Sequence, residues 1–260
     1  MSCLVYCITR EHASMRGRLP LAGNGRAVHF VTQPGLAAAI SEVPDSDVAP
    51  TVPRLRTFAA VVEALHEAYT ILPMRYGCVL PAEERVMALL RERAAEFMAA
   101  LDGVEGCAEM SIRAIFDENP VAPSSPQLLV PKCFSFPSST WEREERREPP
   151  NASGGRAYLA ARKAYYARQT LSAQAATAVV ERAAAVLRGL FVRYVSAYSP
   201  FPTVPYNVPM LSLHFLVRRE RVEPFREVFR ALNLSESTQM LLSGPWPPYH
   251  FVQRKEGPLS

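Results

Sequence analysis

The chain has 260 residues, 48% hydrophobic and 21% charged, a balance typical of a soluble globular protein large enough for two domains. Its 29 basic and 25 acidic residues are interspersed, and the formal charge of +4 comes without the single-sign block that marks nucleic-acid-binding arms. No stretch approaches the roughly 18 apolar residues that a membrane helix needs, and no secretory leader opens the chain, so we expect a cytoplasmic protein.

The first part of the chain alternates short β-branched or aromatic runs with amphipathic stretches. In chain order these runs predict strands over residues 3–8, 28–31 and 36–43, a helix over 55–69, a strand over 70–79, a helix over 81–101 and a strand over 105–116. We expect both helices to cover one face of a single sheet. This order predicts an α+β domain over residues 1–118, with a modified ferredoxin-like fold.

Residues 119–153 have the composition of an interdomain linker. They are rich in proline and serine and include the mixed-charge run Glu-Arg-Glu-Glu-Arg-Arg-Glu over residues 142–148. Such a composition offers few side chains that could build a core.

Residues 157–198 contain no proline and are rich in alanine, arginine, glutamate and glutamine, which favour helix. A straight helix of this length would measure about 63 Å, longer than a domain of this size. The segment therefore either projects as an arm or breaks into an antiparallel pair. We favour a break near residues 170–173.

The remainder predicts a second α+β domain over residues 154–260 with long helices. A buried strand is expected over 210–217, a helix over 222–232 and a strand over 239–242. The chain then enters the segment 243–252, here called the tail, which combines three prolines with Trp246, Tyr249 and Phe251. Prolines limit the entropy that the tail loses on docking, and aromatic rings offer area to bury, so the tail is expected to pack.

Three motifs resemble those of the gas vesicle GvpL/GvpF family. The tail reads Gly-Pro-Trp-Pro-Pro-Tyr-His-Phe-Val over residues 244–252, with His250 where the family usually has a small polar residue. Residues 72–77 read Leu-Pro-Met-Arg-Tyr-Gly, similar to the family's Leu-Pro-(Leu/Met)-Arg-Phe-Gly. Gly155, Tyr158, Leu159 and Arg162 fit its Gly-x-x-Tyr-Leu-x-x-(Arg/Lys) pattern. The order and spacing of the motifs agree over nearly the whole chain.

The resemblance implies a non-enzymatic accessory protein for building gas vesicles, present in the cytoplasm and at the vesicle. Its implied partners are the shell protein GvpA and other accessory gas vesicle proteins, bound during nucleation and assembly. Aromatic residues and arginine dominate interface energetics, so the candidate contact residues are Arg75, Tyr76, Trp246, Tyr249 and Phe251. Two plainer interpretations stay open: Arg75 pairs with a carboxylate, and the tail caps its own domain.

The sequence predicts no catalytic residue, cofactor or metal site. It lacks a nucleophile with its base, a glycine-rich phosphate loop and a Cys-x-x-Cys pair, and its five cysteines are expected to be thiols that pack as small apolar side chains. The five histidines stand apart, and His214 is expected to be a satisfied core histidine.

An alternative function is a nucleic-acid-binding module, because ferredoxin-like sheets can stack bases on exposed aromatics. The aromatic and glycine strand signature of such modules is missing. An enzyme of unrecognised type is a third possibility.

Overall fold

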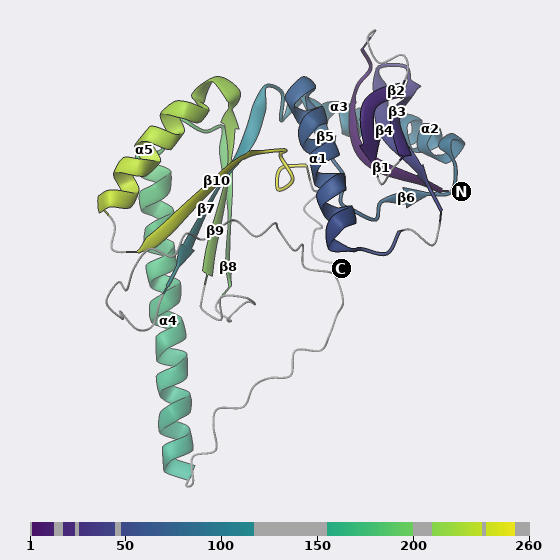
Figure 1. The fold of residues 1–260 in the computed structure, drawn as a ribbon. Helices are drawn as coiled ribbons and strands as arrows, with labels where there is room; N and C mark the ends of the chain where they lie inside the picture. Colours follow the sequence, from purple (N-terminus) through teal and green to yellow (C-terminus); the bar gives the residue numbers. More distant parts are fainter. Residues whose placement is uncertain are drawn as a thin grey trace.

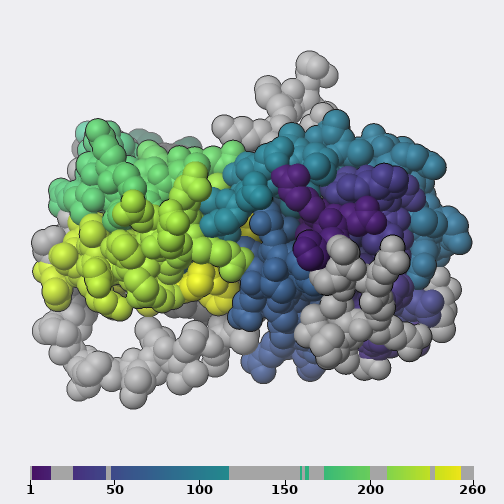
Figure 2. Space-filling model, turned by 90° about the horizontal axis from the view of Figure 1, so that it is seen from above, coloured from purple at the N-terminus to yellow at the C-terminus, as the bar shows by residue number. Residues whose placement is uncertain are grey.

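The structure is a computed structural model, and it describes residues 2–12, 18–23, 26–44, 48–116, 155–199, 210–235 and 238–252. Two lobes lie side by side, the first built from the amino-terminal part of the chain and the second from the carboxyl-terminal part (Figures 1 and 2). Each lobe has its own antiparallel sheet. The α+β class predicted from the sequence is confirmed.

Six strands and three helices make up the first lobe within the residues that the structure describes. The strands are β1 (Ser2–Arg10), β2 (Arg18–Gly23), β3 (Arg26–Gln33), β4 (Leu36–Val43), β5 (Ile71–Pro73) and β6 (Val79–Leu80). The helices are α1 (Val52–Ala68), α2 (Glu83–Glu92) and α3 (Ala94–Asp102). The strand order is β2-β3-β4-β1-β5, and β6 also pairs with β1.

Helices cover both faces of this first sheet, so the expectation that they share one face is wrong. On one face, Leu4 and Tyr6 of β1 pack with Phe58 and Leu65 of α1. On the other face, α2 and α3 pack against the sheet through Val86, Leu90, Phe97 and Leu101. Because the central strands are apolar on both faces, two helical layers are needed to cover them.

In the described part of the chain, the second lobe has four strands and two helices. The strands are β7 (Cys107–Ile115), β8 (Arg193–Ser199), β9 (Met210–Arg218) and β10 (Gln239–Trp246), in the order β10-β7-β9-β8. The helices are α4 (Gly155–Val186) and α5 (Val222–Ser235), and the short 3₁₀ turn η3 (Arg219–Arg221) leads from β9 into α5. Both helices pack on one face of the sheet, through Ala176, Ala183, Phe225 and Phe229.

β7 corrects the predicted domain organisation. We expected the strand near residues 105–116 to complete the first sheet, but β7 is a central strand of the second sheet, paired with β9 on one side and β10 on the other. The boundary expected at residue 118 thus falls after β7, a strand that belongs to the sheet of the second lobe. The linker expected over 119–153 lies outside the described residues.

α4 is one helix of 32 residues, so the expected break near residues 170–173 is wrong. Those residues contain no proline or glycine, and nothing in them opposes helix. The carboxyl-terminal part of α4 packs on the sheet, while its amino-terminal part extends well beyond it (Figure 1). Gly189, with a φ of +85°, follows the end of the helix, and the chain then forms β8 rather than more helix.

Two smaller elements also differ from prediction. The strand expected over residues 70–79 is split into β5 and β6 by a turn, and the helix expected over 81–101 is interrupted at Arg93 between α2 and α3. The predicted thiol burial is confirmed for Cys3, Cys7 and Cys107, whereas Cys78 is only partly buried and Cys133 lies outside the described residues. In the part of the chain that the structure describes, no helix is both long enough and apolar enough to cross a bilayer.

Candidate functional site

The tail crosses from the second lobe to the first. Tyr249 packs against the α1 side of the first lobe, beside the cluster that contains Phe58. Phe251 packs against the cluster on the opposite face of the same sheet, which includes Leu72. The residues after β10 therefore join the two lobes, and the expectation that the tail packs is confirmed.

A close approach of two backbones places the start of the tail on β7. Gly244 has a φ of +117°, and a Cβ at this position would lie 2.6 Å from the backbone oxygen of Glu109. Arg226 of α5 donates to the Gly244 carbonyl oxygen at 2.9 Å. Glycine is required here because any side chain would collide with the backbone of β7.

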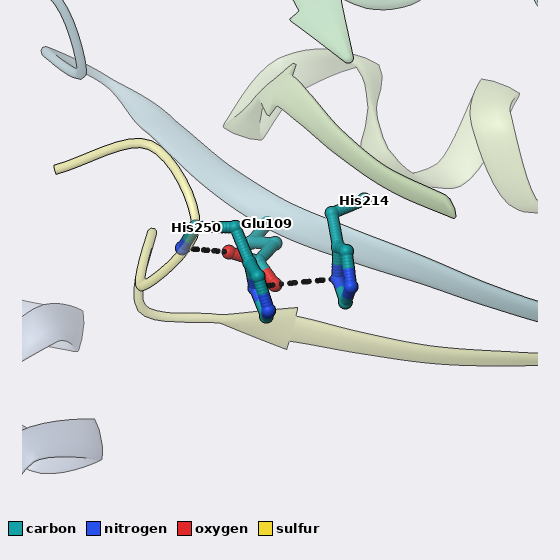
Figure 3. Close-up of side chains that lie close together, drawn as sticks. All are labelled: Glu109, His214 and His250. Carbon is teal, nitrogen blue, oxygen red and sulfur yellow. Dashed lines mark hydrogen bonds and ion pairs between the residues drawn. The ribbon is translucent and has the colours of Figure 1, made fainter. Parts of the chain in front are cut away.

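Glu109, His214 and His250 meet where the tail lies over the second sheet (Figure 3). The Nδ1 atoms of His250 and His214 lie 2.7 and 3.1 Å from Oε1 of Glu109. The backbone N–H of His250 donates to the other carboxylate oxygen, Oε2, at 3.0 Å. The two imidazole rings stack with centroids 3.4 Å apart and planes 14° from parallel.

Ser111 completes the polar contacts of this cluster. Its hydroxyl lies 2.9 Å from Nδ1 of His214 and donates to Oε1 of Glu109 at 3.3 Å. The side chains of Glu109 and His214 are 3% and 11% exposed, whereas that of His250 is 46% exposed. One edge of the cluster therefore reaches solvent through His250.

The alternation of β7 explains how a charged residue comes to be buried here. Successive side chains of a strand point to opposite faces, so Met110 and Ile112 face the core under α4 and α5 while Glu109 and Ser111 face the other way. His214 faces the same side because β9 pairs it with Ser111. The tail then covers this polar face.

The pKa of Glu109 reflects two opposed effects. Burial raises it, since a carboxylate loses its hydration, but the hydrogen bonds from His214 and His250 outweigh burial and lower the pKa from 4.5 to about 2. Glu109 is therefore ionised at neutral pH. Within the described residues, its ionic partners are the two histidines.

A second polar contact joins the lobes, from η3 to α1. The guanidinium of Arg219 donates to the backbone oxygen of His66 and lies 3.3 Å from its Nδ1. Burial, followed by the positive charge of Arg219, lowers the pKa of His66 from 6.5 to about 4. The imidazole is thus neutral at pH 7.

Among the contact residues predicted from the sequence, Arg75 and Tyr76 lie in the turn between β5 and β6. Arg75 is exposed, and Tyr76 is half-buried with its ring against the edge of Phe58, 5.4 Å between centroids. Tyr76 and Tyr249 pack against the same cluster of the first lobe. The tertiary structure thus brings together two of the three motifs.

The tail residues are less accessible than Arg75. Trp246 is half-buried at the end of β10, and Phe251 is half-buried, with its carbonyl oxygen accepting from Arg193 at 3.2 Å. Burial, and then the nearby carboxyl of Glu63, raises the pKa of Tyr249. These positions suit a structural contact between lobes, and a role in partner binding stays a prediction.

Sequence reasoning missed the cluster of Glu109, His214 and His250. His214 is a buried and satisfied core histidine, as expected, but the prediction that the histidines stand apart is wrong for this pair. Two signals were available in the sequence. Glu109 lies inside an apolar strand, and His250 stands where the tail motif usually has a small polar residue. The separation of 105 residues between Glu109 and His214 hides their contact from any spacing rule.

Comparison with known proteins places the chain among gas vesicle proteins. Residues 2–253 match the family model described as gas vesicle synthesis protein GvpL/GvpF. Gas vesicle protein F of Streptomyces sp. (strain CB03234) is 27% identical over 258 residues, which cover 97% of this chain and all of that relative.

Two crystal structures share the fold. GvpF from Anabaena sp. PCC7120 superposes with a TM-score of 0.69 at 15% identity, covering 98% of this chain and 99% of the other. GvpF from Microcystis aeruginosa superposes with a TM-score of 0.68 at 16% identity, covering 97% and 99%.

Proposed function

Because the chain belongs to the GvpL/GvpF family of gas vesicle synthesis proteins, we propose that it is a non-enzymatic accessory protein that binds the shell protein during gas vesicle nucleation and assembly. The match over residues 2–253 is the observation that carries this proposal. It spans both lobes and the tail, so the proposal concerns the whole chain rather than one module.

A physical argument supports a partner of this kind. The small shell protein of gas vesicles is very hydrophobic, and an unassembled subunit exposes apolar surface that aggregates unless a partner covers it. A protein that covers this surface, or that holds several subunits together, would allow the shell to grow without aggregation. Contacts with other accessory gas vesicle proteins belong to the same proposal.

The turn between β5 and β6 is the part of the predicted contact surface best placed to touch a partner. Arg75 is exposed there, while Tyr76, Trp246, Tyr249 and Phe251 are half-buried. An exposed arginine can contribute to an interface without first being released from a core. We therefore place the first partner contact at Arg75 and give the tail the task of holding the lobes in place.

Co-purification of the shell protein with the full chain tests this proposal. Arg75→Glu reverses a charge at an exposed position and should lower recovery of the shell protein at least tenfold while the chain stays folded. Arg91→Glu makes the same change on the exposed face of α2 and should leave recovery unchanged. Equal recovery with both variants would remove Arg75 from the interface, and no recovery with the wild-type chain would refute the proposal itself.

The Trp246→Ala variant distinguishes a tail that only stabilises the fold from a tail that binds the shell protein. Truncation of a packed tryptophan typically costs about 3–5 kcal/mol, and the half-buried Trp246 should fall at the lower end of this range. If the tail only holds the lobes together, recovery of the shell protein should decrease with temperature in parallel with the fraction of folded chain. A folded variant that no longer binds would instead assign Trp246 to the interface.

A further inference from the structure

We propose that Glu109, His214 and His250 form a binding site for one divalent transition-metal ion of the zinc type. The ligands would come from β7, β9 and the tail, three segments that meet only in the folded chain (Figure 3). A bound ion would fasten the tail to the second sheet. The inference rests on this geometry and does not depend on the proposed role in gas vesicle assembly.

Both histidine nitrogens already lie at nearly the spacing from Oε1 of Glu109 that a metal requires. Zinc binds imidazole nitrogen and carboxylate oxygen at about 2.0–2.1 Å in tetrahedral geometry, which places neighbouring ligand atoms about 3.3 Å apart. Nδ1 of His250 and Nδ1 of His214 are 2.7 and 3.1 Å from Oε1 of Glu109. An increase of a few tenths of an ångström in these two spacings, together with a turn of one ring, would admit the ion.

Three polar groups lie around Oε1 of Glu109, more than the two hydrogen bonds that its two lone pairs can accept. Oε1 has two lone pairs, yet both Nδ1 atoms and the Ser111 hydroxyl lie within 3.3 Å of it. One ion that replaces the protons between these atoms would bind all three ligands at once. Such convergence on a single point distinguishes this cluster from an ordinary ion pair.

Charge and ligand type indicate which ion fits. Glu109 is buried, and its partners in the described chain are two imidazoles. A divalent cation that takes the place of the protons between these groups would keep a positive charge beside the buried carboxylate. Two imidazoles with one carboxylate suit zinc, nickel, cobalt or copper, whereas calcium and magnesium favour sites made of oxygen.

Neighbouring groups would orient the ligands. The backbone N–H of His250 holds Oε2 of Glu109 at 3.0 Å, and this bond can persist while Oε1 binds the ion. Ser111 can continue to donate to the carboxylate. Hydrogen bonds of this kind fix the orientation of metal ligands and are part of what makes a site bind tightly.

One ring must turn for the ion to bind. The lone pair of an imidazole nitrogen lies in the ring plane, so two rings stacked 14° from parallel cannot both direct their lone pairs at one ion. His214 is held within β9, but the side chain of His250 is 46% exposed at the end of the tail motif. We assign the movement to His250, and its exposed edge lets water supply a fourth ligand.

The test uses the purified full chain, freed of metal with a chelator and titrated with Co²⁺ or Zn²⁺. We expect one ion per chain, visible Co²⁺ absorption of the intensity typical of four-coordinate sites, and a melting temperature that rises with Zn²⁺ concentration. Zn²⁺ should displace Co²⁺, and Mg²⁺ should not. Absence of stoichiometric uptake at micromolar metal would overturn the proposal.

Two variants assign the bound ion to these residues. His250→Asn keeps a small polar side chain in the tail but removes the imidazole, and it should weaken Co²⁺ affinity at least 100-fold. His29→Ala removes a different histidine, paired with Glu83 at 2.7 Å, and should leave the titration unchanged. A folded His250→Asn chain that binds Co²⁺ like the wild type would refute the site, as would loss of binding in His29→Ala.

Discussion

The sheet of the first lobe is covered by helices on both faces, whereas the sheet of the second lobe has helices on one face and the tail on part of the other. β1 and β4 are buried almost without interruption along their length. β7 instead alternates Ala108, Met110 and Ile112 with Glu109 and Ser111. The buried carboxylate and imidazole of the second sheet lie on the face without helices, and this is where the candidate site lies.

Core truncations should give the largest effects and test this difference between the sheets. Leu4→Ala and Ile8→Ala empty opposite faces of β1, and each should cost about 2–5 kcal/mol of unfolding free energy, measured in urea. In the second sheet, Leu213→Ala should cost as much, while Ser212→Ala should change stability by less than about 0.5 kcal/mol. A silent change at Leu4 or Ile8 would mean that one face of the first sheet is not a true core.

Glu109 should make stability depend on pH in the acid range. Its pKa is about 2 in the folded chain and 4.5 as an ordinary value, so its contribution is complete above pH 4.5 and is lost as pH falls toward 2. The loss should approach about 3 kcal/mol, because each pKa unit corresponds to about 1.4 kcal/mol. Glu109→Gln should flatten the stability profile in this window when unfolding is followed in urea.

His66 should make stability depend on pH in a separate, less acidic range than Glu109. Its pKa falls from 6.5 to about 4 on folding, so the unfolded chain binds the proton more readily and stability decreases as pH falls from 6.5 to 4. This decrease should also approach about 3 kcal/mol. His66→Gln should abolish it and leave the lower window of Glu109 in place. A wild-type profile that is flat between pH 6.5 and 4 would contradict the burial of His66 beside Arg219.

Gly244→Ala tests the contact of the tail with β7. A Cβ would meet the Glu109 backbone oxygen at 2.6 Å in a conformation with φ of +117°, so a cost of about 2–3 kcal/mol is expected. Gly189→Ala is the control, because its φ of +85° is also left-handed but the space around it is open. It should cost about 1 kcal/mol. Equal costs in thermal unfolding would show that backbone conformation alone accounts for Gly244.

Arg193→Ala should have the smallest effect. Arg193 donates to the Phe251 carbonyl oxygen and lies 5.5 Å from the centre of the Phe251 ring, so its loss should cost about 1 kcal/mol. Arg93→Ala removes a similar contact with Phe97 inside the first lobe. Limited proteolysis should show faster cleavage in the tail for Arg193→Ala and no such change for Arg93→Ala.

Local pattern was sufficient to predict most elements. Residues 210–217, 222–232 and 239–242 form a strand, a helix and a strand as predicted, because their hydrophobic periods of two and 3.6 residues reflect burial on one side. The same reasoning misjudged α4. Apolar spacing shows which side of a helix is buried but not whether the whole length rests on a core.

Local hydrophobic periodicity could not predict which distant strands pair with each other. Residues 70–79 look like one strand because most of them are apolar, yet β1 pairs with the two ends of this segment and leaves Arg75 in a turn. Likewise, the composition of β7 fits either sheet. Which partner a strand takes depends on the free energy of the whole sheet, to which residues a hundred positions away contribute.

The amino-acid sequence by itself determined the α+β class, the identity of most helices and strands, and the family, because these follow from local periodicity and from motifs of contiguous residues. Only the tertiary structure decided that β7 belongs to the second sheet, that α4 is unbroken, and that Glu109, His214 and His250 converge. The physical reason is that burial and charge act through space. A carboxylate and two imidazoles become one site only after β7, β9 and the tail have packed together.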